Sequence, residues 1–300
     1  MLRQATVRAK IRRVRAGGPG EGVAWDLLAA EGPLEIRLGV GQADRRSTRS
    51  VAVTMRTPGN DDELAIGLLL AERIIPGPEA IAEVGTEAPE DCSPRGGEVI
   101  RVDLHPEITI DFRRFDRNFF ATSSCGVCGK ASLRALGLDE GRPLHGVGAP
   151  IDAELIYRWP EALRRRQSVF EATGGLHGSA LMAIDGRFLA VREDIGRHNA
   201  VDKLMGARSL GTLDGPAADS EAVALLVSGR VGFEIVQKAV AGGIPIVLAV
   251  GAPSSLAVEV AEAFGLTLIG FVGPERFNIY CGDWRVRETP DHVVRPVRSS

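Results

Sequence analysis

Three uninterrupted apolar segments in the last third of the chain constrain its fold more than any other feature. They span residues 222–227, 245–250 and 266–272, and two stretches with helical periodicity, 231–240 and 256–264, separate them. Apolar runs without alternation are typical of strands buried on both faces, and intervening helices indicate parallel pairing through right-handed crossovers. The sequence therefore predicts a βαβαβ unit here.

Glycines follow each of these predicted strands. The residues concerned are Ser228, Gly229 and Arg230 after the first strand, 251–255 after the second, and 273–276 after the third. Parallel strands end at one edge of the sheet, where backbone N–H groups, helix N-termini and arginines can bind phosphate. Glycine-rich turns also occur simply because they turn tightly, so the pattern leaves both a phosphate site and a structural role open.

The first 121 residues have a different pattern. Apolar and polar residues alternate over 7–11, 35–38, 99–104 and 108–112, which predicts strands in a mostly antiparallel sheet. A helix is predicted over 61–74, after a Pro-Gly turn. We therefore expect a smaller N-terminal α+β domain.

The sequence before the parallel strands, over residues 152–205, predicts a helix, a hairpin and a second helix. The helix is predicted over 152–167, the hairpin pairs 180–184 with 188–191, and the second helix covers 199–205. Arg197 and His198 stand where the hairpin gives way to that helix, and ligands of α/β proteins often bind at such positions. A structural role as a helix cap is the alternative for His198, and His177 is equally ambiguous.

Composition excludes several classes of protein. The 300 residues are 44% hydrophobic with a formal net charge of −3, which supports a sizeable core and argues against nucleic acid as the main partner. Four cysteines do not make a disulfide framework, and neither a signal peptide nor a membrane-spanning run is apparent. We expect a cytoplasmic protein that binds neither nucleic acid nor membrane.

The most reactive segment is the loop 122–130, which places Cys125 and Cys128 three residues apart between glycines and beside Lys130. A neighbouring cation and a helix N-terminus both favour the nucleophilic thiolate, and residues 131–136 are predicted to form such a helix. The sequence thus predicts an exposed, reactive dithiol.

Three chemistries suit this cysteine pair. Structural zinc needs four ligands, and the chain offers no second CxxC motif. A thioredoxin-like dithiol switch places its motif within a βαβ unit, whereas mostly antiparallel strands precede this one. Sulfur carriage, in which one thiolate takes a terminal sulfur as a persulfide, suits an exposed loop flanked by glycines.

Five separated segments of the chain resemble the FdhD family, whose members are sulfur carrier proteins needed for formate dehydrogenase activity. The segments are 122–130, 192–203, 233–238, 256–261 and 271–280, and they occur in the family's order. The resemblance implies that a cysteine desulfurase delivers sulfur to the CxxC loop. It also implies that the protein passes this sulfur to the molybdenum cofactor, in its bis(molybdopterin guanine dinucleotide) form, before the cofactor enters formate dehydrogenase.

The same resemblance assigns residues and architecture. Cys125 corresponds to the persulfide cysteine and Cys128 to its partner. The stretch matching the family's cofactor-binding segment consists of Phe271, Val272, Gly273, Pro274, Glu275 and Arg276. The family's larger domain is a three-layer, cytidine-deaminase-like α/β domain, expected here over 131–300, after the N-terminal domain over 1–121 and the loop over 122–130. The resemblance also implies a homodimer, and we expect no tightly bound structural metal.

The strand ends suit the cofactor that the resemblance implies. A guanine dinucleotide carries pyrophosphate, and Ser228, Gly229 and Arg230 are predicted phosphate neighbours, with Arg197 and His198 near the pterin or the molybdenum. A non-covalent chaperone that carries the molybdenum cofactor to formate dehydrogenase is the alternative function.

Overall fold

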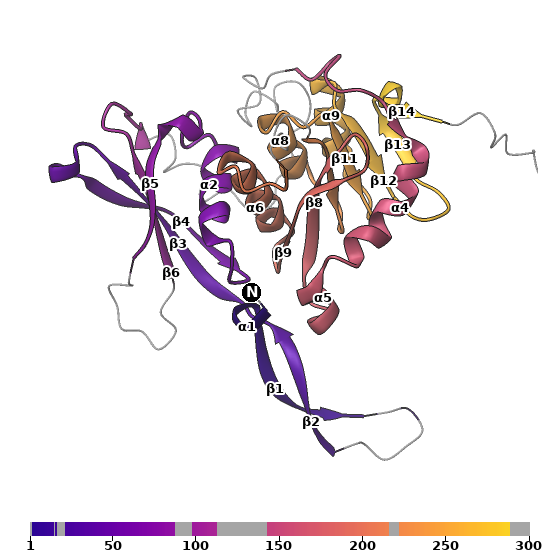
Figure 1. Ribbon diagram of the computed structural model, residues 1–300, viewed down its shortest axis with the longest axis horizontal. Helices are drawn as coiled ribbons and strands as arrows, with labels where there is room; N and C mark the ends of the chain where they lie inside the picture. The colour runs from indigo at the N-terminus through magenta and orange to yellow at the C-terminus, as the bar shows by residue number, and fades with distance from the viewer. Residues whose placement is uncertain are drawn as a thin grey trace, which may run out of the picture.

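The computed structural model describes residues 2–14, 16, 22–87, 98–112, 143–215 and 222–288 of the chain. Cys92, Cys125 and Cys128 lie outside these described residues, as do the whole predicted loop 122–130 and the predicted helix 131–136. Within them, a smaller body built on a four-stranded sheet lies beside a larger one built on a six-stranded sheet, and a two-stranded ribbon projects away from both (Figure 1).

The larger sheet confirms the predicted parallel unit. Its strand order is β13-β12-β11-β10-β8-β9, in which β10, β11 and β12 are parallel, while β8 runs antiparallel to both β10 and β9. The strands are β8 (His177–Ala183), β9 (Phe188–Asp194), β10 (Ala222–Val227), β11 (Ile246–Ala249), β12 (Thr267–Gly270) and β13 (Asn278–Cys281). The predicted hairpin corresponds to β8 and β9, and both strands include residues beyond the predicted ranges 180–184 and 188–191.

Helices cover both faces of this sheet. Helices α6 (Arg197–Ser209), α8 (Phe233–Ala241) and α9 (Ser255–Phe264) pack on one face, and α4 (Ala153–Arg164) packs on the other (Figure 1). The predicted helix 152–167 ends at Arg164, and a short helix α5 (Ser168–Thr173) follows it. Helix α6 is longer than predicted, so its first turn contains Arg197 and His198.

The smaller sheet has the order β4-β3-β6-β5, and helix α2 (Asp61–Ala71) covers it. Its strands are β3 (Gly32–Val40), β4 (Ser47–Arg56), β5 (Ile81–Glu87) and β6 (Glu98–Leu104). The pairs β3–β4 and β5–β6 are antiparallel, as predicted, but β3 and β6 are parallel. Arg73 adopts a positive φ of 53°, which L-residues rarely do in a helix, so α2 ends before residue 74.

The predicted strand over 108–112 is wrong. These residues have no strand pairing, and Ile108, Ile110 and Phe112 instead pack half-buried against the core beneath the smaller sheet. Alternation of apolar and polar residues marks a segment with one buried side, and an irregular segment that covers a core edge has such a side as well.

The remaining elements are short or lie outside the two bodies. The ribbon pairs β1 (Thr6–Arg13) with β2 (Gly22–Ala29) after the short helix α1 (Leu2–Ala5), and β7 (Ile151–Asp152) pairs with β14 (Val286–Arg287). Single 3-10 turns are η1 (Ala43–Arg45), η2 (Pro78–Ala80) and η5 (Asp283–Arg285). Among the described residues, no helix combines the length and the apolar character needed to cross a membrane.

Helices α2 and α6 join the two bodies at a crossing that leaves no room for side chains. A methyl group on Gly67 would lie 1.8 Å from the carbonyl oxygen of Asp202, and one on Gly206 would lie 1.8 Å from that of Glu63. Both distances are far inside van der Waals contact, so the two backbones touch directly. The smaller body is thereby held against the same helix whose first turn carries Arg197 and His198.

Buried polar contacts reinforce this junction. The Lys203 ammonium lies 2.7 Å from the Asp194 carboxylate and donates to the Thr57 carbonyl at 2.8 Å. Asp194 also accepts from the backbone N–H of Thr57 at 3.1 Å, and the Asn199 amide donates to the Met55 carbonyl at 2.8 Å. Asp194, Asn199 and Lys203 therefore fix the end of β4 to the larger body.

Candidate ligand site at the strand ends

The ends of the three parallel strands are joined edge to edge, as predicted. The Gly251 N–H donates to the Gly229 carbonyl, and the Phe271 N–H donates to the Gly251 carbonyl, both at 3.0 Å. A methyl group on Gly251 would lie 3.0 Å from that Gly229 oxygen. Glycine at position 251 thus permits the close approach that connects the predicted site residues 228–230 with the segment 271–276.

The segment after β12 has a strained, exposed backbone. Phe271 has a φ of 52°, although it is neither glycine nor asparagine, and its side chain is 44% exposed. The Gly273 N–H then donates to the Arg276 carbonyl at 3.0 Å, which closes a turn. Exposed large side chains held in the left-handed region occur often at ligand-binding sites.

The side chains of this segment do not all face solvent. Pro274, Glu275 and Arg276 are exposed, and Gly273 is half-buried. Val272 is buried in the core that packs against α4, so only its backbone is available to a ligand. Arg230, at the end of β10, is exposed, whereas Ser228 and Gly229 are half-buried.

Arg197 and His198 lie with two further residues on the α6 side of the strand ends. His198 Nε2 is 3.7 Å from the Glu234 carboxylate at the start of α8. His177, at the start of β8, borders Gly229, on which a methyl group would lie 3.3 Å from the imidazole Nδ1. Among the described residues, the buried atoms Arg197 Nε and His198 Nε2 have no hydrogen-bond partner, so both are able to donate to a ligand.

This cluster favours the neutral form of His177. Burial, together with the charges of Arg197 and His198, lowers the pKa of His177. The neighbouring His198 imidazole, 3.7 Å away, lowers the pKa of Glu234 and so favours its carboxylate form. At pH 7, His177 is a neutral donor and acceptor.

Three helices begin at the same edge. Helices α6, α8 and α9 begin shortly after the ends of β9, β10 and β11, so their free N–H groups and positive dipole ends lie beside the strand ends. In α9 one of these groups is already used, because the Ser254 hydroxyl accepts from the Ala257 N–H at 3.2 Å. The arrangement suits an extended anionic ligand such as a pyrophosphate.

Cys281 is not suited to carry sulfur as a thiolate. Its Sγ–H donates to the Leu266 carbonyl at 3.2 Å from within strand β13, and burial raises the pKa of its thiol. Among the described residues, no three metal-ligating side chains come together in one place.

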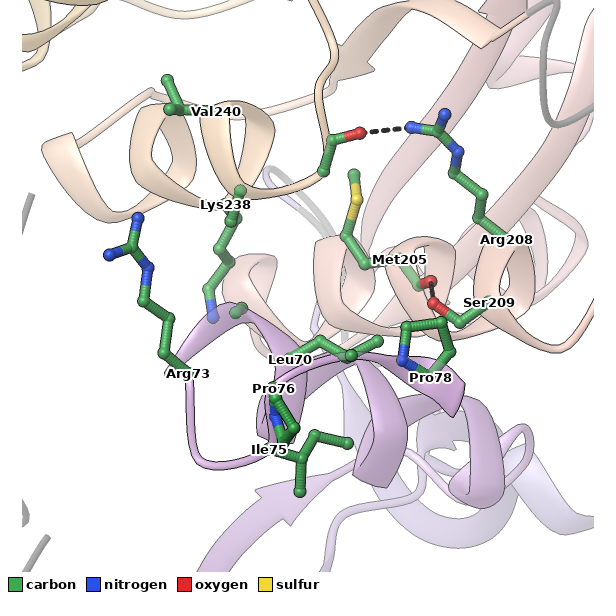
Figure 2. Close-up of a pocket in the computed structure, with 14 residues that line it drawn as sticks. Leu70, Arg73, Ile75, Pro76, Pro78, Met205, Arg208, Ser209, Lys238 and Val240 are labelled. Carbon is green, nitrogen blue, oxygen red and sulfur yellow. Dashed lines mark hydrogen bonds between the residues drawn. The ribbon is translucent and has the colours of Figure 1, made fainter. Parts of the chain in front are cut away.

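Another cavity, of about 750 Å³, lies elsewhere, where α2, α6 and α8 end. Figure 2 shows Arg73, Lys238 and Arg208 around it. Arg208 donates to the Gly242 carbonyl at the end of α8, and the Lys238 ammonium lies 2.7 Å from the Asp202 carboxylate. The C-terminal ends of helices are negative, so these cations stabilise the helix ends and do not indicate an anion site.

Sequence reasoning missed Glu234 and the role of Gly251, and it left His177 unassigned. Glu234 lies 36 positions after His198, and only the packing of α8 beside α6 brings the two together. No local signal in the sequence predicts that contact. The glycine after β11, by contrast, was visible as the end of a buried strand.

The strand order and the helices on both faces of the larger sheet define a three-layer α/β protein with a smaller α+β body. Comparison with known proteins is more specific, because the FdhD/NarQ family model matches residues 29–287. The chain belongs to this family.

Individual relatives agree with that assignment. "Sulfur carrier protein FdhD" of Nocardia farcinica is 44% identical over 94% of this chain and 95% of its own length, and the protein of the same name from Streptomyces coelicolor is 43% identical over 94% and 96%. The crystal structure of a protein described as a formate dehydrogenase accessory protein, from Desulfotalea psychrophila, superposes with a TM-score of 0.68. It is 25% identical and covers 94% of this chain and 100% of its own.

Proposed function

We propose that this protein is a cytoplasmic sulfur carrier that serves formate dehydrogenase. The observation that carries the proposal is the match, over more than nine-tenths of both chains, to relatives named sulfur carrier proteins. The sequence of this chain adds the reactive pair Cys125 and Cys128 in its CxxC motif. In this proposal a cysteine desulfurase is the sulfur donor, and the molybdenum cofactor is the acceptor.

Loading follows the rules of thiol–disulfide exchange. The Cys125 thiolate attacks the terminal sulfur of the persulfide on the desulfurase, a new S–S bond forms on Cys125, and the cysteine thiolate of the desulfurase leaves. No external oxidant or reductant is needed, because the transferred sulfur atom has the same oxidation state in both persulfides. The product is a Cys125 persulfide.

Unloading needs two electrons, which Cys128 supplies. Its thiolate attacks the inner sulfur of the Cys125 persulfide, a Cys125–Cys128 disulfide forms, and the terminal sulfur leaves as sulfide to become a ligand of the molybdenum. A cellular dithiol then reduces the disulfide and restores both thiols. Two thiols in one loop are therefore sufficient for both steps.

The substrate cofactor is proposed to bind at the strand ends. Bis(molybdopterin guanine dinucleotide) carries two pyrophosphates, and the beginnings of α6, α8 and α9 offer N–H groups for such anions. The exposed Arg230 and Arg276 are able to bind phosphate bidentately. Arg197 and His198 add donors on the α6 side.

Three further features belong to the same proposal. The sheet order, with β8 antiparallel to parallel neighbours, supports a likeness to the cytidine deaminase fold. The division into residues 1–121, 122–130 and 131–300 and the assembly into a homodimer remain predictions.

Persulfide mapping tests the proposal most directly. The purified protein is incubated with an active cysteine desulfurase and cysteine, and mass spectrometry then locates any reducible added sulfur atom. We expect one sulfur on Cys125 in the wild type and in Cys281→Ala, the matched control for a thiol that lies within strand β13. We expect none in Cys125→Ala.

Activity separates this proposal from its rival. Formate dehydrogenase matured with the Cys125→Ala/Cys128→Ala variant should be inactive. Full activity with that variant would contradict sulfur transfer and identify the protein as a non-covalent chaperone that delivers the cofactor.

A further inference from the structure

The projecting ribbon β1–β2 concentrates the exposed apolar surface of the protein. Of the fifteen large hydrophobic side chains that are exposed in the described part of the chain, six lie between residues 7 and 28. They are Val7, Val14, Val23, Trp25, Leu27 and Leu28, with exposed fractions from 38% to 71%. A two-stranded ribbon is marginally stable alone in water, so a surface of this kind indicates an interface.

One face of the ribbon combines apolar groups with positive charge. The register pairs Arg8 with Leu27, Lys10 with Trp25 and Arg12 with Val23, and these six residues form the basic face of the ribbon, since directly paired residues point the same way. The Arg8 guanidinium lies 5.1 Å from the Trp25 ring centroid. Among the described residues, none of the three cations has an acidic partner. The basic face therefore suits an acidic surface that also offers apolar contacts.

The base of the ribbon is anchored, so the basic face has a defined direction. The Ala30 N–H donates to the Ala5 carbonyl at 2.8 Å, and Ala5 is buried against Val169 and Leu176 of the larger body. The two strands then extend away from both bodies, which leaves the basic face uncovered (Figure 1). A surface that is fixed before association loses less conformational entropy when it binds.

An acidic recess lies beside the base of the ribbon. Its volume is about 500 Å³, and it is lined by Gln4 of α1 and by three carboxylates of the smaller body, Asp61, Asp62 and Glu98. The Arg56 guanidinium serves two of them, because it donates to Asp61 at 2.9 Å and also to Glu98. Burial and the neighbouring Asp61 carboxyl raise the pKa of Glu98. Asp62 has no cationic partner within the described ranges, so negative charge is in excess here.

The basic face and the acidic recess are complementary in charge and adjacent on one chain. The recess includes Gln4, and the ribbon begins at Thr6. A two-fold symmetric dimer requires a self-complementary surface, in which one feature of each copy meets a different feature of the other. A two-fold axis beside α1 would bring each basic face to the acidic recess of the partner.

The ribbon is long enough for such an interface. Its strands of eight residues, at about 3.3 Å per residue and about 4.8 Å apart, make a surface about 26 Å long and about 10 Å wide. Two ribbons that each bury one face against an equal area of the partner would remove about 1,000 Å² from water, the lower end of specific interfaces. A dimer of this size dissociates at low concentration, which leaves the ribbon uncovered in part of the population.

We propose that two copies of this protein associate through their ribbons, with the basic face of each ribbon seated in the acidic recess of the other. Lys10 and Arg12 neutralise the excess negative charge of the recess, and Trp25 contacts its apolar part at Val84. The proposal rests on the proposed function in one respect: it gives a defined interface to the homodimer expected there.

Charge reversal on each side of the interface tests the proposal. Analytical ultracentrifugation of the full-length protein measures the dissociation constant of the dimer at micromolar concentrations. Lys10→Glu/Arg12→Glu and, separately, Asp62→Lys should each raise this constant about tenfold or more, because like charges then face each other. Arg158→Glu/Arg165→Glu, at exposed positions of α4, changes the net charge as much as the ribbon variant and should leave the constant unchanged.

Mixing the two reversed variants is the most specific measurement. In a dimer of one Lys10→Glu/Arg12→Glu copy and one Asp62→Lys copy, one contact has its native charges and the other has its charges exchanged. The mixture should therefore form heterodimers at a concentration where neither variant forms homodimers. Association in the mixture requires both variants to be folded, so misfolding cannot produce the expected result.

Four results would overturn the proposal. They are an unchanged dissociation constant in both reversed variants, which places the dimer interface elsewhere; loss of both homodimers without heterodimers in the mixture; a wild type that stays monomeric, which contradicts the homodimer as well; and an intact dimer of the ribbon variant that no longer binds the desulfurase, which assigns the ribbon to that partner. Persulfide formation on Cys125 is measured on the same samples, and its absence contradicts sulfur carriage without affecting the interface.

Discussion

Lys203 and Asp194 form an ion pair whose side chains are 2% and 0% exposed. Removing one partner of such a pair leaves an uncompensated charge in the interior. Lys203→Met should therefore lower the free energy of unfolding by about 3–5 kcal/mol. Urea denaturation measures this loss, and Arg165→Ala, which breaks a surface pair with Glu161, should cost less than about 1 kcal/mol.

The double variant Lys203→Met/Asp194→Asn provides the internal control for that prediction. It removes both charges, so it should recover part of the stability that the single variant loses. A double variant as unstable as the sum of the two single variants would show that the charges do not interact.

At the scale of single residues, the sequence predicted where candidate residues lie better than which contacts they make. Arg197 and His198 were expected at a strand-to-helix transition, and they lie in the first turn of α6 beside the strand ends. The neighbouring Asp194 and Lys203 could not be recognised as structural, because Thr57, which they contact, lies 137 and 146 positions away.

The crossing of α2 and α6 makes the most specific prediction at the scale of elements. Gly206→Ala would place a methyl group 1.8 Å from the Glu63 carbonyl oxygen, so the helices must move apart. We expect a loss of about 1–3 kcal/mol or more in the free energy of unfolding, measured by urea denaturation. Gly85→Ala in strand β5 is the control, because a methyl group there meets nothing within 4 Å.

A Gly206→Ala variant as stable as the Gly85→Ala control would contradict direct backbone contact between the two helices. Helix propensity alone would favour alanine over glycine by about 1 kcal/mol, so any net loss must come from the contact.

Strands with continuous apolar sequences were predicted more reliably than segments whose structure depends on contacts with distant parts of the chain. The strands β10, β11 and β12 could be recognised because burial on both faces requires continuous apolar residues. The segment 108–112 was mistaken for a strand, because a half-buried irregular segment has the same alternation. The parallel pairing of β3 with β6 had no local signature, since it depends on how the chain crosses over α2.

For the whole molecule, we predict that the two bodies unfold together. The helix crossing and the Lys203–Thr57 contacts join them through buried groups, so amides of β3 and β10 should exchange with free energies within about 1 kcal/mol of each other. The projecting ribbon β1–β2 should exchange much earlier, since a two-stranded sheet is marginally stable. Hydrogen exchange with mass spectrometry measures all three, and much faster exchange of β3 than of β10 would contradict joint unfolding.

The direct contact of α2 with α6 also limits how proteins of this kind can diverge. Each helix at the crossing is fitted to the backbone of the other. Gly67 and Gly206 face backbone atoms, so a larger residue at either position could not be accommodated by a smaller side chain on the opposite helix. A recombination event that replaced the gene segment for one body would bring together helices that were never fitted to each other. The two bodies should therefore be inherited as a single unit, and new specificities should arise by substitution at the strand ends more readily than by exchange of domains.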